Sequence, residues 1–314
     1  MTVTLFKALA DETRLRLLRI LLAHELSVNE LVTVLEMGQS RISRHLRILT
    51  DAGLLTSRRD GLWVFYQAQQ EGENRHFLSA IEPFLQDIPE AAQDVENTNR
   101  LLEERNKKSR QFFNEIAEDW DNLNSEILGD FDLAGAVCNA MPQNCRLAVD
   151  LGCGTGTVLK RMLDHSLGVI GVDNSPGMLK ACKKTFADTA EAEQRISLRI
   201  GELEHLPLRD HEADFASINL VLHHIHQPDK VLQEIRRILT QHGLLFISDF
   251  KKHKDESMRS RYGDHWLGFD TNKLAMALRA NGFSRTTVRE QRVNKGLTLI
   301  MLTSYVSVPG STGV

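Results

Sequence analysis

Three glycines alternate in the stretch Val149-Asp150-Leu151-Gly152-Cys153-Gly154-Thr155-Gly156. The apolar residues 147–151 before them predict a buried parallel strand, and the pattern over 157–163 predicts the start of a helix. The glycines therefore lie at a strand-to-helix turn, where a ligand can approach the backbone only if Cβ atoms are absent. Such a turn is typical of a loop that binds a nucleoside-containing cofactor.

The spacing of these glycines argues against a dinucleotide. The fingerprint G-x-G-x-x-G would place its third glycine at position 157, which is threonine here. With an acidic residue one position before Leu151-Gly152, the pattern resembles motif I of the class I S-adenosylmethionine (SAM) methyltransferases. The resemblance implies a Rossmann-like α/β fold in which the loop approaches the methionine part of SAM. The loop residues that it assigns to the cofactor are Asp150, Gly152, Gly154 and Gly156.

A second acidic residue supports a nucleoside site. Residues 169–173 form a short β-branched run that ends in Asp173, 23 positions after Asp150. A carboxylate at the end of the second strand of an open α/β sheet accepts hydrogen bonds from ribose hydroxyls. The sequence Asp173-Asn174-Ser175-Pro176 also resembles a helix start, so a helix N-cap is the alternative role of Asp173. We favour ribose binding, with Asn174 in the same site.

Later segments resemble the same methyltransferases. Residues 197–208 resemble the family segment G-D-A-E-x-L-P-F, which implies that Glu202 lies beside the adenine amino group and that Leu203 supplies a backbone N–H. Residues 213–225 predict the fourth strand and end in the family's L-H-H-I, with Asn219 passing under the methionine moiety. Antiparallel strands around 285–290 and 297–306 then complete a seven-stranded mixed sheet.

Residues 111–121 resemble the leader helix that precedes such domains. The resemblance makes Phe113 and Trp120 candidates for a lid over the cofactor. Two aromatic residues seven positions apart are also ordinary in helix packing, so both interpretations stay open.

The N-terminal third of the chain has a different pattern. Leucines predict a helix over 11–22, Ser27-x-x-Glu30 predicts a capping box and a short helix to Leu35, and a third helix is predicted over 39–51. Two short strands, 54–59 and 62–67, are joined by Asp60-Gly61, a strong hairpin signal. This order of elements indicates a mainly α winged helix-turn-helix, which binds DNA through its third helix and wing.

Polar residues on the third helix and the wing suit phosphates and base edges in the major groove. A solvated charged helix face is the alternative. The candidates for DNA binding are Gln39, Ser40, Arg41, Ser43, Arg44, His45, Arg47, Arg58 and Arg59.

Three segments here, 8–18, 39–49 and 52–55, closely resemble ArsR/SmtB-type repressors. The resemblance implies a homodimer, built on the first helix and the helix after the wing, that binds palindromic double-stranded operator DNA. Where arsenic and cadmium sensors carry C-x-C, this chain has Ser27 and Asn29, which removes the thiolate ligands. His76 on the helix after the wing lacks the paired ligand spacing of zinc sensors. The regulatory signal is therefore expected from another part of the chain.

Histidines indicate where a methyl acceptor would bind. His223 and His224 belong to the L-H-H-I motif, and His226 follows. Because we find no carboxylate or cysteine near them in the sequence, we predict no metal site. We expect them to line the acceptor pocket, with one imidazole as a possible base. The segment after strand 243–250 resembles the acceptor-side insert of ArsR-methyltransferase fusions, which adds four candidates: His253, Glu256, Arg259 and His265.

Length and composition limit the number of domains and the location of the protein. The 314 residues, 42% of them hydrophobic, suffice for two domains, and the net charge of −4 requires any DNA-binding surface to be local. No apolar run of about 18 residues is present, so we expect a cytoplasmic protein without a membrane segment. The four cysteines show no C-x-x-C pairing, which disfavours disulfides and zinc knuckles. They also do not lie in the pattern of arsenite methyltransferases.

We therefore predict a winged-helix domain (1–88), a helical linker (89–110), a methyltransferase domain (111–308) and a disordered tail (309–314). The predicted function is a DNA-binding regulator of the repressor type, whose fused domain transfers a methyl group from SAM to a small molecule and releases S-adenosylhomocysteine (SAH). A regulator that only senses SAM or SAH is the first alternative. A methyltransferase that uses the winged helix only to dimerise is the second.

Overall fold

The structure is a computed structural model that describes residues 2–187 and 194–307. The chain divides into two compact units, residues 1–108 and 109–314. The boundary falls within a 26-residue helix, α6 (Ala91–Ile116). The predicted disordered tail, 309–314, lies outside the described residues.

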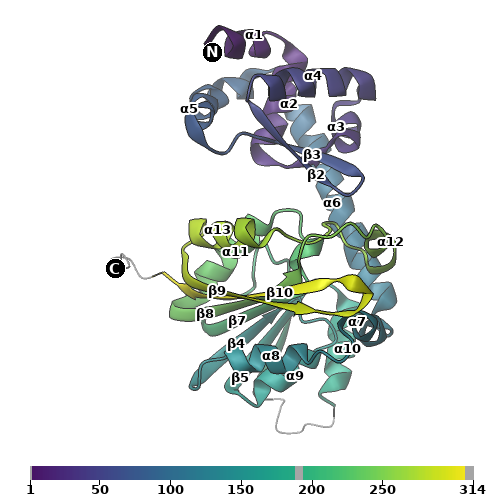
Figure 1. Ribbon diagram of the computed structural model, residues 1–314, viewed down its shortest axis with the longest axis vertical. Coiled ribbons are helices and arrows are strands. Elements are labelled where there is room, and N and C mark those ends of the chain that lie inside the picture. Colours follow the sequence, from purple (N-terminus) through teal and green to yellow (C-terminus); the bar gives the residue numbers. More distant parts are fainter. Residues whose placement is uncertain (1, 188–193, 308–314) are drawn as a thin grey trace. The chain divides into compact units, whose positions relative to one another are not determined.

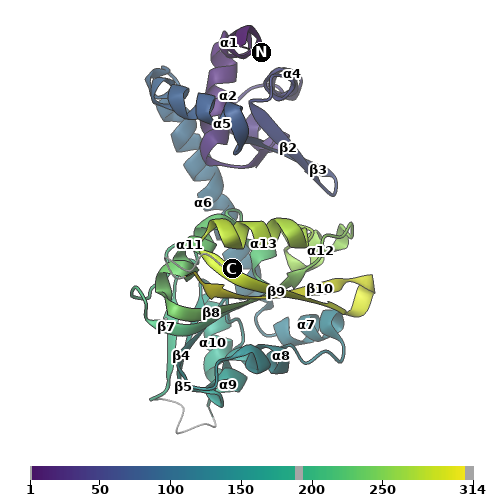
Figure 2. The ribbon, with the colours of Figure 1, turned by 60° about the vertical axis from the view of Figure 1, so that its left-hand side comes forward.

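The first unit is a winged helix-turn-helix, as predicted (Figures 1 and 2). Its small antiparallel sheet has the order β1-β3-β2. The elements are α1 (Thr2–Leu9), α2 (Glu12–Ala23), β1 (Leu26–Ser27), α3 (Val28–Leu35), α4 (Gln39–Asp51), β2 (Leu55–Asp60), β3 (Trp63–Ala68), α5 (Gly72–Ile81), the 3-10 helix η1 (Glu82–Asp87) and the first part of α6. The helix bounds agree with the sequence pattern because the caps form: Asp11 caps α2, and Ser27 and Glu30 make both bonds of a capping box.

The hairpin turn differs from its prediction by one residue. Asp60 is not in the turn but ends β2, opposite Trp63. Its side chain is buried and accepts a hydrogen bond from Arg58 Nη1 at 2.9 Å. Gly61 has a φ of 56°, which L residues rarely adopt, so the turn consists of Gly61 and Leu62. An internal ion pair thus overrides the local Asp-Gly turn signal.

The first part of α6 packs into this unit. Arg16 of α2 donates two hydrogen bonds, of 2.7 and 2.6 Å, to the carboxylate of Asp94, which is 1% exposed. Asn97 Nδ2 donates to the carbonyl of Val34, and Arg105 is paired with Glu30. The predicted linker helix is therefore bound to the winged-helix core along several turns.

The second unit is a seven-stranded sheet with helices on both faces (Figure 1). The strand order is β6-β5-β4-β7-β8-β10-β9, with β10 antiparallel to both of its neighbours. The strands are β4 (Cys145–Leu151), β5 (Ser166–Asp173), β6 (Ile196–Ile200), β7 (Ala213–Asn219), β8 (Leu239–Phe250), β9 (Phe283–Arg292) and β10 (Thr298–Val306). The chain runs from β4 outward to β6 and then returns to β7, so the β4–β7 junction is the switch point at which such sheets bind ligands.

Helices bury both faces of this sheet. One apolar cluster joins it to α8 (Leu133–Ala140), α9 (Thr157–Leu163) and α10 (Pro176–Thr185). The other joins it to α11 (Pro228–Ile238) and α13 (Thr271–Ala280). The shorter helices are α7 (Trp120–Leu128), η2 (Leu222–His224), α12 (Ser257–Tyr262) and η3 (Asn294–Gly296). No helix among the described residues is long and apolar enough to cross a membrane.

We predict that Arg16→Met lowers the free energy of unfolding by about 3 kcal/mol, because it leaves the carboxylate of Asp94 buried without its cation. Arg100→Met is the matched control on α6, since Arg100 and Glu96 form an exposed pair whose loss costs less than about 0.5 kcal/mol. Urea unfolding measures the loss, and hydrogen exchange shows whether α2 and α6 are the helices affected. Equal effects of the two substitutions would contradict the prediction.

Candidate functional site

Helix α4 separates an apolar side from a polar one. Ile42, Leu46 and Leu49 are fully buried against the first unit's core. The opposite side exposes six of the predicted DNA-binding residues: Gln39, Ser40, Arg41, Ser43, Arg44 and Arg47. This face therefore offers several donors and three guanidinium groups to a nucleic acid.

Two other predicted DNA-binding residues are less exposed and lie against carboxylates of the first unit. His45 is half-buried with Nδ1 3.6 Å from the carboxylate of Asp11, and burial lowers the pKa of its imidazole. Arg58 contacts the carboxylates of Glu25 and Asp60 and lies over the ring of Phe65. Arg58 thus fixes the base of the wing, which the sequence pattern did not indicate. Arg59 is exposed on the same strand.

In the second unit, the glycine loop lies at the end of β4, where it was predicted. Gly152, Gly154 and Gly156 all have positive φ, of 70°, 51° and 84°. A Cβ at Gly152 would lie 2.5 Å from Val221 Cγ2, and one at Gly156 would lie 2.5 Å from Cys182 Sγ. Both conformation and space therefore require glycine at these positions.

Asp173 closes this loop from the end of β5. Its Oδ2 accepts a hydrogen bond from the Gly154 N–H at 3.0 Å, and its Oδ1 accepts one from the Ser175 N–H at 2.8 Å. Burial raises the pKa of Asp173, and these N–H groups oppose the rise. The N-cap of α10 is Ser175, so the alternative interpretation of Asp173 as the cap is wrong.

The next two candidates meet across the ends of β5 and β6. Asn174 Nδ2 donates to Glu202 Oε2 at 2.9 Å, and Leu203 beside it is buried. Sequence reasoning proposed both polar residues for one cofactor but did not predict their contact.

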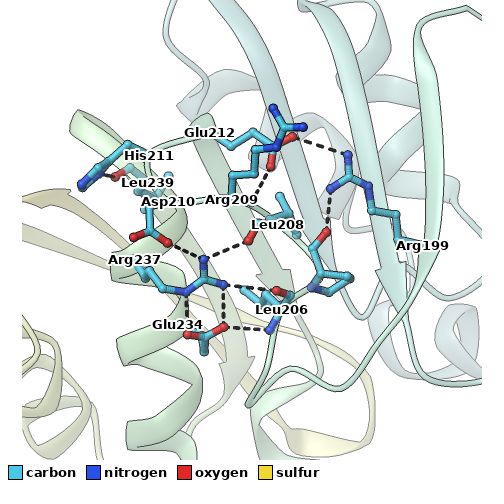
Figure 3. A network of polar contacts seen from close by, with 11 residues as sticks. Arg199, Leu206, Leu208, Arg209, Asp210, His211, Glu212, Glu234, Arg237 and Leu239 are labelled. Atoms are coloured by element: carbon cyan, nitrogen blue, oxygen red, sulfur yellow. Dashed lines mark hydrogen bonds and ion pairs between the residues drawn. The ribbon is translucent and has the colours of Figure 1, made fainter.

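A polar network holds residues 206–208, which follow Glu202 in the chain (Figure 3). Arg237 of α11 donates to the carbonyls of Leu206 and Leu208, and Glu234 accepts the Leu206 N–H. Arg199 of β6 donates to the Pro207 carbonyl. The main chain of residues 206–208 is therefore fixed by side chains from two elements, which limits the positions that Glu202 can take.

Asp150 lies beneath the glycine loop at the end of β4. Burial raises its pKa to about 7, and hydrogen bonds from Ser217 (2.7 Å) and Asn219 (3.3 Å) oppose the rise. Asn219 in turn accepts a bond from Ser248 at 2.8 Å. These contacts join the ends of β4, β7 and β8 at the switch point.

The leader segment lies beside the glycine loop. A Cβ at Gly154 would lie 3.4 Å from Trp120 Nε1, and Asp121 accepts a hydrogen bond from Thr155 Oγ1 at 2.6 Å. The ring of Phe113 packs edge-on against both Trp120 and His224, with centroids 5.5 and 4.8 Å apart. The two aromatic residues therefore connect the loop to the predicted acceptor side.

His223 lies between two carboxylates that the sequence placed far away. Its Nδ1 is 2.8 Å from Asp249 Oδ1, and its Nε2 is 3.5 Å from Asp264 Oδ1. Burial alone would lower the pKa of His223, but Asp249 and Asp264 raise it to about 9. We predicted no metal site because we found no carboxylate near these histidines in the sequence. The structure shows that this reason is wrong.

His224 and Asp264 complete this group. His224 Nδ1 is 3.1 Å from the Gly263 carbonyl, while its Nε2 is buried without a hydrogen-bond partner among the described residues. Burial and the neighbouring His223 hold the pKa of His224 well below its ordinary value. Burial raises the pKa of Asp264 to about 6. Together, His223, His224 and Asp264 are a group whose atoms could hold a metal ion.

Asp264 was missed because it belongs to a distant segment. The backbone N–H groups of His265 and Trp266 donate to the His223 carbonyl and bring this segment onto η2. The other histidines lie close by: His253 packs against Phe250, whose ring also contacts His223, and His226 packs against His265. Arg259 contacts Glu256 and the His265 carbonyl.

The four cysteines, all in the second unit, are buried and unpaired by disulfides. Burial raises the pKa of Cys138, and that of Cys145 to about 12. A hydrogen bond with Cys182 and burial raise the pKa of Cys153. All four thiols lie in the core of the second unit.

Comparison with known proteins assigns a family to part of each unit. Residues 11–57 match the model for bacterial regulatory proteins of the arsR family, and residues 149–247 match a methyltransferase domain. The arsenic resistance transcriptional regulator ArsR1 of Pseudomonas putida is 51% identical over 67 residues, which are 21% of this chain. The chain spans 52% of the length of that relative.

The second unit has relatives of its own. The ubiquinone/menaquinone biosynthesis C-methyltransferase UbiE of Campylobacter jejuni is 25% identical over 178 residues, 52% of this chain and 72% of that enzyme. Among solved structures, the [4+2]-cyclase SpnF has a TM-score of 0.53 at 17% identity, covering 64% of this chain and 96% of SpnF. At that identity the likeness concerns the fold alone.

We predict that Gly152→Ala costs about 3 kcal/mol of unfolding free energy, from positive-φ strain together with the overlap on Val221. Gly296→Ala separates the two effects, because Gly296 has the same φ of 70° and open space around it. Strain alone predicts about 1 kcal/mol there. Thermal or urea unfolding of both variants measures the difference, and a Gly152→Ala cost no larger than that of Gly296→Ala would refute the steric argument.

Proposed function

Because the chain joins an ArsR-family regulatory domain to a methyltransferase domain, we propose that it binds double-stranded operator DNA and transfers a methyl group from SAM to a small-molecule acceptor. The observation that carries the second half is the glycine loop with its closing contacts. Three positive-φ glycines form the turn at the switch point, and Asp173 holds Gly154 in place. Asn174 and Glu202 supply polar groups at the next strand ends. This arrangement supports SAM, with its methionine part at the loop and its nucleoside toward Glu202.

The exposed side of α4 supports the DNA-binding half. Arg44 and Arg47 are not buried by the first unit, and guanidinium groups bind phosphate and guanine edges. Apolar side chains support a homodimer: Val3 and Phe6 of α1 and Phe84 of η1 are all more than half exposed. Such residues gain from burial against a second copy, and they lie on or next to the helices expected to form the interface.

Methyl transfer places few demands on acid–base chemistry. SAM supplies a methyl group on a positively charged sulfur, and the acceptor's lone pair bonds to that carbon as the sulfur–carbon bond breaks and its electron pair returns to sulfur. The protein must align the two and exclude water. Alignment alone is worth about 7–11 kcal/mol in favourable model reactions. Phe113 and Trp120 are placed to exclude water, and His223 and His224 face the acceptor side.

A regulator that senses SAM or SAH without catalysis is the second candidate. SpnF is named as a cyclase and yet shares this fold, so the fold does not by itself require methyl transfer. The contacts of Gly154, Asp173 and Glu202 would serve a sensor equally well. Single-turnover methyl transfer to fractionated metabolites distinguishes the two, because only the enzyme converts SAM to SAH in step with a methylated product.

We predict that SAM or SAH changes operator affinity several-fold, since coupling of about 1 kcal/mol is typical of two linked sites. Fluorescence anisotropy at fixed salt, with DNA from upstream of the chain's own gene, measures the change. Arg44→Ala together with Arg47→Ala should abolish specific binding and flatten the salt dependence. If the operator affinity is the same with and without SAM or SAH, cofactor sensing is rejected. If the double variant binds the operator as tightly as the wild type, the assigned DNA surface is rejected.

For the cofactor, we predict that Asp173→Asn weakens SAM binding at least about tenfold, because an amide replaces one acceptor oxygen with a donor that opposes the Gly154 or Ser175 N–H. Asp164→Asn is the control, since Asp164 is an exposed acid at the end of α9. Isothermal titration of both variants with SAM gives the comparison. An Asp173→Asn protein that keeps wild-type affinity would remove Asp173 from the site.

A further inference from the structure

We propose that His223, His224 and Asp264 bind a divalent transition-metal ion on the acceptor side of the methyltransferase unit. Two imidazoles and one carboxylate match the donors that zinc takes in catalytic sites, where three protein ligands leave one position open. The inference starts from the side chains that the fold brings together, because Asp264 is far from the two histidines in the sequence.

The separations fit one ion. One ligand atom from each residue lies within 4.8 Å of the others, and His223 Nε2 is 3.5 Å from Asp264 Oδ1. Ligands bound to the same zinc at about 2.0–2.1 Å in tetrahedral geometry are about 3.4 Å apart. The first pair already has this spacing, and the other two separations are at most 4.8 Å.

Both histidines have the supporting contacts of metal ligands. His223 Nδ1 is bonded to Asp249, and His224 Nδ1 is bonded to the Gly263 carbonyl, which can only accept. Each Nδ1 therefore donates to its acceptor, and Nε2 is the atom that each ring offers to the ion. Metal-binding histidines commonly donate their other N–H to a carboxylate or a backbone carbonyl in this way.

The remaining ligand atoms lack hydrogen bonds among the described residues. Asp264 is 4% exposed, and neither of its carboxylate oxygens accepts one. His224 Nε2 is also buried without one. Leaving a buried polar atom unsatisfied costs about 1–3 kcal/mol. A salt-linked Asp249–His223–Asp264 group would account for the two buried carboxylates, but it would leave His224 Nε2 without a partner. A metal ion would account for the burial of His223, His224 and Asp264 together.

The position of the ion would define the acceptor class, and this step rests on the proposed function. His224 contacts Phe113, which packs on Trp120 beside the glycine loop. An open coordination position there suits an acceptor with an ionisable oxygen or sulfur, because a bound metal ion lowers the pKa of such a group. Alcohols, phenols and thiols are therefore the acceptors to test first.

The test needs neither SAM nor an acceptor. We expect chelator-treated full-length protein to take up one zinc ion per chain in isothermal titration, and cobalt(II) to give visible absorption of a four- or five-coordinate site. Asp264→Asn and His224→Gln should weaken zinc binding at least about 100-fold, and Asp249→Asn about 10–100-fold through the support of His223. His242→Gln, an exposed histidine on β8 outside the cluster, is the matched control and should keep the wild-type affinity.

Thermal unfolding checks that the variants fold. Zinc should raise the wild-type Tm in a concentration-dependent manner and leave that of Asp264→Asn unchanged. Zinc binding that survives Asp264→Asn, or no saturable uptake by wild-type protein, would overturn the proposal. Methyl transfer at full rate by metal-free protein would reject the ion's role but leave the proposed function intact. Zinc uptake without any methyl transfer would support the metal site but reject the proposed methyltransferase activity.

Discussion

The second unit depends on the contact between the Asp173 carboxylate and the Gly154 N–H. A loop with three positive-φ glycines has few conformations that its own side chains can stabilise, so a neighbouring strand must hold it. Asp173 does so with one oxygen while its other oxygen fixes the start of α10. The same buried carboxylate thereby links β4, β5 and α10, and the ligand site inherits the rigidity of the sheet.

Local patterns predicted most of the fold. The capping box at Ser27, the bounds of α4 and the strand before Gly152 were all correct because each depends on residues within a few positions of one another. One error arose where a side-chain contact overrides the turn signal: Asp60 ends β2, and its buried carboxylate pairs with Arg58. Of the two roles considered for Asp173, that of helix cap is excluded because Ser175 caps α10.

The candidate site shows the same division. The glycine loop and Asp173 were predicted from their spacing and Glu202 from a family resemblance, and all of them lie at or just after the end of a strand. The pairing of His223 with Asp249 and Asp264 was not predicted from spacing, because these residues lie 26 and 15 positions apart (249 minus 223, and 264 minus 249), on η2, on β8 and in the segment after α12. Backbone hydrogen bonds bring residues 264–266 next to η2 and so place Asp264 beside His223. Such bonds leave no periodic pattern in the sequence from which they could be predicted.

The buried cysteines have a practical consequence. All four thiols belong to the methyltransferase unit, and the winged-helix unit has none. Because only an accessible thiolate reacts quickly, the rate of labelling by a small thiol reagent measures how often this unit opens. The chain thus contains its own reporter for the stability of one unit, which stays silent while the other unit unfolds.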